Sequence, residues 1–148
     1  MTETNSVTED IVYTARVRAT GGRAGAIASE TGELALNLAR PAERGTGAGT
    51  DPEELFAAGY AACFDSALTV VARRERISLG ATTTTVSVSL VVSSIQSYRI
   101  SVAIHVDAPS CGLEDVERAV AAADQTCPYS LAIRGNVEVA LTFSGLGQ

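Results

Sequence analysis

The chain has 148 residues, of which 46% are hydrophobic, and its formal net charge at pH 7 is −6. This length and apolar content predict one globular domain over residues 1–148, with a polar segment at 1–10. All eleven basic residues are arginines, and they form no basic stripe, which disfavours nucleic-acid binding. The start "MTETNSVTED" lacks the basic residues and the apolar stretch of a secretory signal, so we expect a cytoplasmic protein.

The first third of the chain has the pattern of β-structure. Apolar and polar residues alternate over 11–18, which predicts a half-buried strand. The stretch "TGGRAG" at 20–25 predicts a glycine-rich turn, "TG" at 31–32 predicts a hairpin turn, and 40–50 predicts a loop. The strand after the hairpin turn is expected to point its alternate leucines inward: Leu34, Leu36 and Leu38.

A long apolar helix is predicted next. Asp51 suits the N-cap, Pro52 the first helical position, and Glu54 completes a capping box. Over 55–72 the only charged residue is Asp65. A helix that is apolar nearly all round is typically buried, so we expect a central core helix that ends at the arginine-rich stretch "RRER".

The same helix raises the questions of membrane insertion and of self-association. The eighteen residues 55–72 are almost long enough to cross a bilayer, but Gly59, Asp65 and the lack of a companion span argue against a membrane protein. One small sheet and one further helix hide only part of such a helix. A homodimer that buries the rest is therefore expected.

The remaining sequence predicts a hairpin, a helix and a final strand. Alternating apolar residues over 82–92 and 97–107, joined by a short polar turn, predict an antiparallel hairpin. A helical period covers 113–126 and is broken or restarted by Pro128, and 135–143 predicts another strand. This order of elements predicts an α+β fold on a mainly antiparallel sheet.

Three cysteines without a secretory signal suggest reduced thiols, a metal site or redox chemistry. Cys63 lies about twelve residues into its helix, so that helix's dipole cannot ionise it and a reactive thiolate there needs a cation, with Arg23 and Arg134 as candidates. On composition alone, Cys63 is more often a small buried hydrophobe. Cys127 continues the inward face of its helix and lies next to the break at Pro128.

Other cysteine chemistries fit the spacing less well. A zinc site would need four ligands of which no pair has the close spacing of structural zinc sites: Cys63, His105, Cys111 and Cys127. A Cys-His hydrolase would have only His105 as its base, and a thioredoxin-type Cys-x-x-Cys is missing from the sequence. A redox site formed by two cysteines that meet in space remains.

Three separated motifs carry a family resemblance: "ATGGRAG", "GTDPEELFAAGYAACF" and "DQTCPYSLAIRGNVEV". Together they resemble the organic hydroperoxide resistance proteins, the Ohr branch of the OsmC/Ohr family, from Tyr13 to Phe143. The resemblance implies antiparallel sheets packed around a buried central helix in an intertwined homodimer.

The resemblance also implies a mechanism and a set of site residues. Cys63 would attack an organic hydroperoxide and pass through a sulfenic acid, and Cys127 would resolve it as a disulfide. Arg23 would stabilise the thiolate, and Glu53 would orient Arg23. The disulfide would be re-reduced by an external dithiol of the lipoyl type, dihydrolipoamide or a lipoylated protein, and no bound cofactor or metal is implied.

Aromatic residues near the motifs are available to hold the alkyl or fatty-acyl chain of the peroxide, although aromatic residues are more often simply core. These residues are Phe56, Tyr60, Phe64 and Tyr129. The chain departs from the family pattern at Asp51, which replaces an asparagine, and at Asp65, which is expected to face away from Cys63. Cys111 lies outside the motifs, near a helix start where a thiol can be somewhat acidic.

Three other functions stay open at this point. A general OsmC-type peroxidase would have weaker substrate preference. A carrier or sensor of fatty-acyl hydroperoxides would oxidise once without turnover. A structural dimer with inert thiols would resist both peroxides and alkylating reagents.

Overall fold

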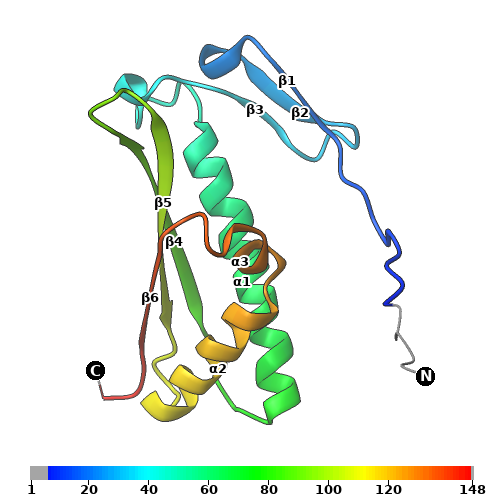
Figure 1. The fold of residues 1–148 in the computed structure, drawn as a ribbon, viewed down its shortest axis with the longest axis vertical. Coiled ribbons are helices and arrows are strands. Elements are labelled where there is room, and N and C mark those ends of the chain that lie inside the picture. The colour runs from blue at the N-terminus through cyan, green and yellow to red at the C-terminus, as the bar shows by residue number, and fades with distance from the viewer. Residues whose placement is uncertain (1–6, 148) are drawn as a thin grey trace, which may run out of the picture. The chain divides into compact units, whose positions relative to one another are not determined.

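The computed structural model describes residues 7–147, so residues 1–6 of the predicted polar segment lie outside the described part (Figure 1). The chain forms two compact units, the first ending at Asp51 and the second beginning at Pro52. The single-domain organisation stays a prediction.

The first unit is a three-stranded antiparallel sheet in the order β1–β2–β3. Its elements in chain order are β1 (Val17–Thr20), the 3-10 helix η1 (Gly22–Ala24), β2 (Ala26–Ser29), β3 (Ala35–Asn37) and the 3-10 helix η2 (Pro41–Glu43). Gly21 and Gly22 adopt φ values of 75° and 57°, a region that side chains disfavour, which is why the predicted turn at 20–25 is rich in glycine. Gly32 likewise forms the predicted hairpin turn with φ 77°.

The predicted strand over 11–18 is wrong for most of its length. Regular pairing begins only at Val17, opposite Ser29, and the side chains of Ile11 and Tyr13 are 88% and 78% exposed. Because β2 ends at Ser29 and the chain turns there, the segment before Val17 has no partner strand among the described residues of this unit. Among the predicted inward leucines, Leu38 is buried but Leu36 is exposed.

The second unit combines one sheet with three helices. Its elements are α1 (Pro52–Glu75), β4 (Thr83–Val92), β5 (Tyr98–Asp107), α2 (Leu113–Thr126), α3 (Pro128–Ile133) and β6 (Val139–Ser144). The predicted hairpin forms with Val86 opposite Ile104 and Val88 opposite Val102. The β6 strand pairs parallel to β5, because α2 and α3 return the chain to the end of the sheet at which β5 begins. This one pair departs from the predicted antiparallel pattern.

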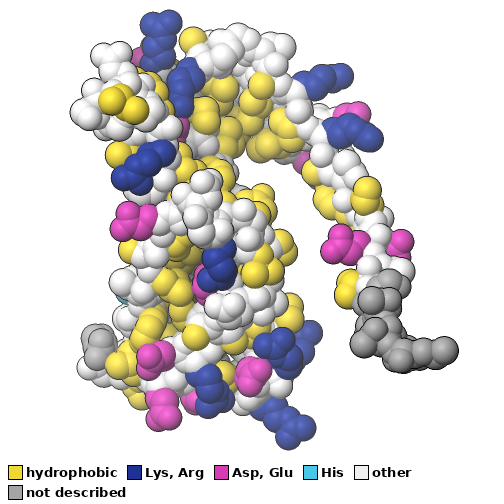
Figure 2. All heavy atoms as spheres, viewed as in Figure 1, with side chains coloured by type: hydrophobic (Ala, Val, Ile, Leu, Met, Phe, Trp, Pro, Cys, Tyr) yellow, Lys and Arg dark blue, Asp and Glu magenta, His cyan; other side chains and the backbone are white. Residues whose placement is uncertain are grey.

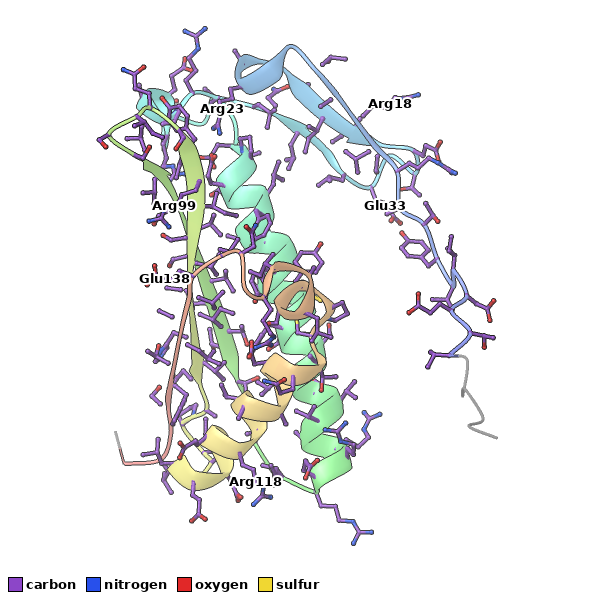
Figure 3. All side chains as sticks on the ribbon, in the orientation of Figure 1. Arg18, Arg23, Glu33, Arg99, Arg118 and Glu138 are labelled. Carbon is purple, nitrogen blue, oxygen red and sulfur yellow. The ribbon has the colours of Figure 1, made fainter. Side chains whose placement is uncertain are left out.

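The core of this unit lies between the sheet and the helices α1 and α2 (Figure 1). The inward residues of β5 and α2 are almost fully buried, as their periodicity predicts. They are Val102, Ile104 and Val106 on the strand, and Val116, Ala119, Val120 and Ala123 on the helix. The opposite face of the sheet is polar, and Arg99 and Glu138 project from it (Figure 3).

The helix α1 begins directly after Asp51, as its capping residues predict, and carries one buried face. That face consists of Tyr60, Phe64, Ala67, Leu68, Val71 and Ala72. Elsewhere the helix is less covered: Val70 is 56% exposed, and only 33% of its most apolar window is buried. Its length and a mean hydropathy of 1.6 would suffice to cross a membrane, a property that core helices share.

Charged side chains are distributed without a dominant sign on the face shown in Figure 2, where the arginines and the acidic residues are interspersed. This distribution matches the small negative net charge of the sequence. The expectation that the protein binds no nucleic acid stays a prediction.

Candidate functional site

Two of the three cysteines meet in the second unit. The Sγ atoms of Cys63, on α1, and Cys127, between α2 and α3, are 3.4 Å apart, and all three cysteines are free thiols. A disulfide has an S–S distance of about 2.05 Å, so these two thiols are in contact without a bond. Cys127 is fully buried, whereas Cys63 is partly exposed. The side chains that the sequence separates by sixty-four residues thus form one dithiol site.

Cys127 is positioned by a break between two helices. It ends α2, donating its backbone N–H to the Ala123 carbonyl oxygen at 2.8 Å, and it is also the N-cap of α3. Its extended backbone (φ −62°, ψ 119°) is the conformation favoured before a proline, and Pro128 begins the next helix. The predicted restart at Pro128 is therefore confirmed, and it turns the Cys127 thiol toward α1.

The surroundings of Cys63 favour its neutral thiol. Burial raises the pKa of Cys63, and the adjacent Cys127 raises it further, while a backbone hydrogen bond from Tyr129 lowers it. The N–H group of Tyr129 belongs to the first turn of α3, so this short helix supplies a donor that α1 cannot provide. A cation is still needed for a thiolate at neutral pH.

Of the two predicted cations, Arg134 is engaged elsewhere. Its Nη2 donates to the Asp124 carbonyl oxygen at 2.8 Å and to the Asp124 carboxylate at 3.0 Å. Arg23 lies on η1 in the first unit (Figure 3). Its approach to Cys63 stays a prediction, because Arg23 and Cys63 belong to different units.

Glu53 lies in the first turn of α1, ten residues before Cys63. This spacing corresponds to about 15 Å along a helix axis. Glu53 is therefore too far along α1 for its carboxylate to contact the sulfur directly, which suits the predicted role of orienting an arginine. That role also stays a prediction.

Three of the four predicted pocket residues form an aromatic cluster beside the thiols. The ring centroids of Phe56 and Tyr60 are 6.2 Å apart, those of Phe56 and Tyr129 are 6.3 Å apart, and those of Tyr60 and Tyr129 are 5.7 Å apart. Gly59 leaves room for this cluster, since a Cβ there would lie 3.1 Å from the Tyr129 Oη. Tyr60 and Phe64 are fully buried in the core, whereas Phe56 is partly exposed and Tyr129 is 41% exposed. Binding of substrate by these residues stays a prediction.

A buried polar pair that the motifs did not single out joins the same two elements. The Tyr60 Oη and the Ser130 Oγ are 2.7 Å apart, and both residues are buried. Beside them lies a cavity of about 210 Å³, whose polar lining includes Tyr60, Ser130, Asp124 and Arg134. The signal for Ser130 was present in the sequence, because it follows Cys127 by one helical turn in "TCPYS".

The remaining candidates lie apart from the thiol pair. Asp65 accepts a hydrogen bond from Thr84 on β4 at 2.9 Å, so it points toward the sheet and away from Cys63, as predicted. Cys111 is buried, and burial followed by the nearby Asp115 raises its pKa, which disfavours the somewhat acidic thiol that a position near a helix start allows. Asp51 is buried and pairs with Arg44.

A metal site does not form among residues 7–147, where no group of three His, Cys, Asp or Glu side chains is arranged to hold an ion. The imidazole of His105 is exposed on the outer face of the sheet. Its Nδ1 lies 2.8 Å from the Thr142 Oγ1 and its Nε2 lies 3.3 Å from the Ser144 Oγ.

Residues 45–142 match the family described as OsmC-like protein, a range that contains both cysteines of the pair. The chain belongs to this family. The resemblance drawn from the three sequence motifs is therefore confirmed.

Relatives within the family share most of the chain. The organic hydroperoxide resistance protein OhrA of Bacillus subtilis is 42% identical over 134 residues, which cover 88% of this chain and 94% of that protein. The crystal structure of Bacillus subtilis OhrB is 40% identical, covers 90% of this chain and 100% of its own, and superposes with a TM-score of 0.84. A Legionella pneumophila organic hydroperoxide resistance protein also gives 0.84, at 44% identity, covering 91% and 99%. The predicted α+β fold is confirmed by these structures.

Proposed function

We propose that this protein is a thiol peroxidase that reduces organic hydroperoxides to alcohols. The observation that carries the proposal is the pair of free thiols, Cys63 and Cys127, with sulfur atoms 3.4 Å apart. Membership of a family whose relatives are organic hydroperoxide resistance proteins supports the substrate class. One thiol of the pair is partly exposed and the other is buried, which suits an attacking and a resolving role.

The chemistry proceeds in two steps on the protein. The Cys63 thiolate attacks the terminal peroxide oxygen, the O–O bond breaks, and a proton is taken up to give Cys63 sulfenic acid and an alcohol. The Cys127 sulfur then attacks the sulfenic sulfur, forming the disulfide and releasing water. Because Cys127 is already in contact, resolution competes well with overoxidation of Cys63.

The predicted partners have defined parts in this scheme. Arg23 lowers the pKa of Cys63 against the effect of burial and stabilises negative charge on the departing alkoxide, while Glu53 orients the guanidinium by a two-pronged hydrogen bond. An external dithiol of the lipoyl type, dihydrolipoamide or a lipoylated protein, returns two electrons to the disulfide. The protein acts in the cytoplasm as a homodimer.

Substrate preference follows from the two accessible rings of the aromatic cluster, Phe56 and Tyr129, which pack against the buried Tyr60. An alkyl or aryl group that packs against these rings gains about 0.8 kcal/mol per buried methylene, which hydrogen peroxide cannot gain. The protein therefore favours organic peroxides. Phe64 supports this surface from inside the core.

The experiment is a titration of the reduced protein with one equivalent of cumene hydroperoxide and, separately, of hydrogen peroxide. Intact mass and peptide mapping follow the thiols. We expect rapid formation of a Cys63–Cys127 disulfide with the organic peroxide, a slower reaction with hydrogen peroxide, and turnover when dihydrolipoamide is added. Cys111→Ser is the matched control and should leave these rates unchanged. Survival of both thiols, or oxidation at Cys111 alone, would overturn the proposal.

A further inference from the structure

A hydrogen bond lies one helical turn from the thiol pair and joins the same two elements. Tyr60 precedes Cys63 by three residues on α1, and Ser130 follows Cys127 by three residues on α3. Residues three apart on a helix lie on one face, so the two cross-links are neighbours between the same surfaces. One is the Tyr60–Ser130 hydrogen bond of 2.7 Å, and the other is the 3.4 Å sulfur contact.

Both hydroxyl groups of this hydrogen bond are removed from water. Tyr60 is 0% exposed and Ser130 is 3% exposed, and burial raises the pKa of the Tyr60 hydroxyl, which the hydrogen bond to Ser130 partly offsets. A buried hydroxyl is costly unless it has a partner, so each group depends on the other. The two are held at one separation and orientation, a restriction that two apolar side chains would not impose.

Side-chain packing alone does not hold the start of α3 in place near the Tyr60–Ser130 hydrogen bond. A half-open pocket of about 210 Å³ lies against Tyr60 and Ser130, and its lining also includes Val137, Val139 and Leu141. Because this pocket is open on one side, no packed side chain holds the start of α3 from there. The end of α3 is tied separately, because Arg134 donates to both the carbonyl and the carboxylate of Asp124 on α2.

We propose that Tyr60 and Ser130 are positioning residues for the disulfide between Cys63 and Cys127. Their hydrogen bond holds the first turn of α3 against α1 and thereby keeps the Cys127 sulfur within reach of Cys63. The role of this geometry in resolving a sulfenic acid rests on the proposed peroxidase function. In that step the S–S bond forms, the S–OH bond breaks, and the Cys127 proton leaves with the hydroxide as water. The sulfur atoms close from 3.4 Å to about 2.05 Å.

The first test does not depend on peroxide chemistry. Wild type, Tyr60→Phe, Ser130→Ala and the double variant are equilibrated in dithiothreitol redox buffers, and the Cys63–Cys127 disulfide is quantified by alkylation and mass spectrometry. We expect either single change to disfavour the disulfide by about tenfold. The double variant should be no worse than the single ones, because the two hydroxyls act as a unit. Ser130→Thr keeps the hydroxyl and should restore the wild-type equilibrium.

The matched control is Thr84→Val, which removes a side-chain hydrogen bond to the other side of α1, at Asp65. It should lower thermal stability without moving the disulfide equilibrium. An unchanged disulfide equilibrium in Tyr60→Phe and Ser130→Ala would overturn the positioning role. The role would also be overturned if Ser130→Ala shifts the equilibrium but Ser130→Thr does not return it to the wild-type value.

The second test separates this inference from the proposed function. After one equivalent of cumene hydroperoxide, we expect Ser130→Ala to lose the Cys63 thiol at the wild-type rate but to form the disulfide about tenfold more slowly, with dimedone-trapped sulfenic acid accumulating. An equal slowing of the first step would overturn the positioning role. If wild-type Cys63 does not react with the peroxide at all, the proposed function fails, and the redox-buffer result alone decides the positioning role.

Discussion

At the scale of single residues, the main feature is a thiol whose local surroundings oppose its ionisation. Burial and the neighbouring Cys127 raise the pKa of Cys63, and the Tyr129 backbone hydrogen bond opposes them only in part. A peroxidatic cysteine must be a thiolate, so the proposed function needs an added positive charge. Arg134 is paired with Asp124, which leaves Arg23 as the cation that the proposal requires.

The pH dependence tests this requirement. A raised pKa means that the reactive thiolate is scarce at neutral pH and increases as the pH rises. We therefore expect the rate of Cys63 oxidation by cumene hydroperoxide to have its pH midpoint shifted upward in Arg23→Gln by about one pH unit or more, with Arg23→Lys in between. Stopped-flow measurements from pH 5 to 10 check this shift. A midpoint that coincides with wild type would show that Arg23 does not act on Cys63.

Solvent exposure distinguishes the Cys63 thiol from the Cys111 thiol. Cys111 is 4% exposed and its pKa is raised, while Cys63 is partly exposed. Iodoacetamide on the native reduced protein at pH 8 should therefore modify Cys63 first and Cys111 at least about tenfold more slowly. Peptide mapping over time measures both rates. In urea the two rates should converge, and preferential modification of Cys111 in the native protein would contradict the structure.

At the scale of elements, the site is a contact between one long helix and a helix that restarts. The helix α1 carries Tyr60 and Cys63 on the face toward α3, and Pro128 turns the chain so that Cys127 and Ser130 face them. Gly59 permits this contact, because its missing side chain leaves room for the Tyr129 ring. The aromatic surface and the thiol pair thus depend on the same close approach of two helices.

Substitution of Gly59 by alanine separates stability from substrate binding. Alanine is favoured over glycine within a helix by about 1 kcal/mol, and the ring that it would meet belongs to Tyr129, which is 41% exposed and free to shift. We expect the free energy of unfolding to stay level or to rise by up to about 1 kcal/mol, while the KM for cumene hydroperoxide rises severalfold. Urea denaturation and steady-state kinetics measure the two effects.

A reverse substitution on another helix provides the control for Gly59→Ala. Ala121→Gly, at an exposed position of α2, should lose about 1 kcal/mol of unfolding free energy without changing KM. An unchanged KM in Gly59→Ala would show that the Tyr129 ring takes no part in substrate binding.

At the scale of the whole molecule, the apolar surface of α1 is larger than the second unit covers. Only 33% of its most apolar window is buried, and Val70 is 56% exposed in the middle of the helix. Outside a membrane, a large exposed apolar surface usually marks a protein–protein interface. In a symmetric homodimer, one interface would bury this surface of α1 on both chains.

The predicted dimer is tested by mass in solution. Light scattering should give twice the 15.3 kDa mass of one chain. A charge introduced into the apolar surface as Val70→Asp should shift the protein toward monomer, because an unpaired charge is costly to bury. Leu146→Asp places the same charge at an exposed position near the C-terminus and should leave the mass unchanged. A wild-type mass of a single chain would exclude the dimer.

Part of the fold and the site was determined by the sequence itself. The start of α1 after Asp51, the bounds of α2, the restart at Pro128 and the β4–β5 hairpin follow from capping, proline and periodicity, which act between residues near in sequence. The family follows from short sequence motifs, and the two cysteines proposed to react lie within them. The predicted strand over 11–18 does not form before Val17, because an alternation of apolar and polar residues favours strand pairing but cannot supply a partner strand.

Only the tertiary structure decided which distant side chains touch. The 3.4 Å contact of Cys63 with Cys127, the Tyr60–Ser130 hydrogen bond and the pairing of Arg134 with Asp124 depend on how α1, α2 and α3 pack. The burial that raises the pKa of Cys111 likewise appears only when the core closes around it, and the parallel pairing of β6 only when α2 and α3 return the chain. Local patterns set each element, whereas burial and long-range contact are properties of the assembled whole.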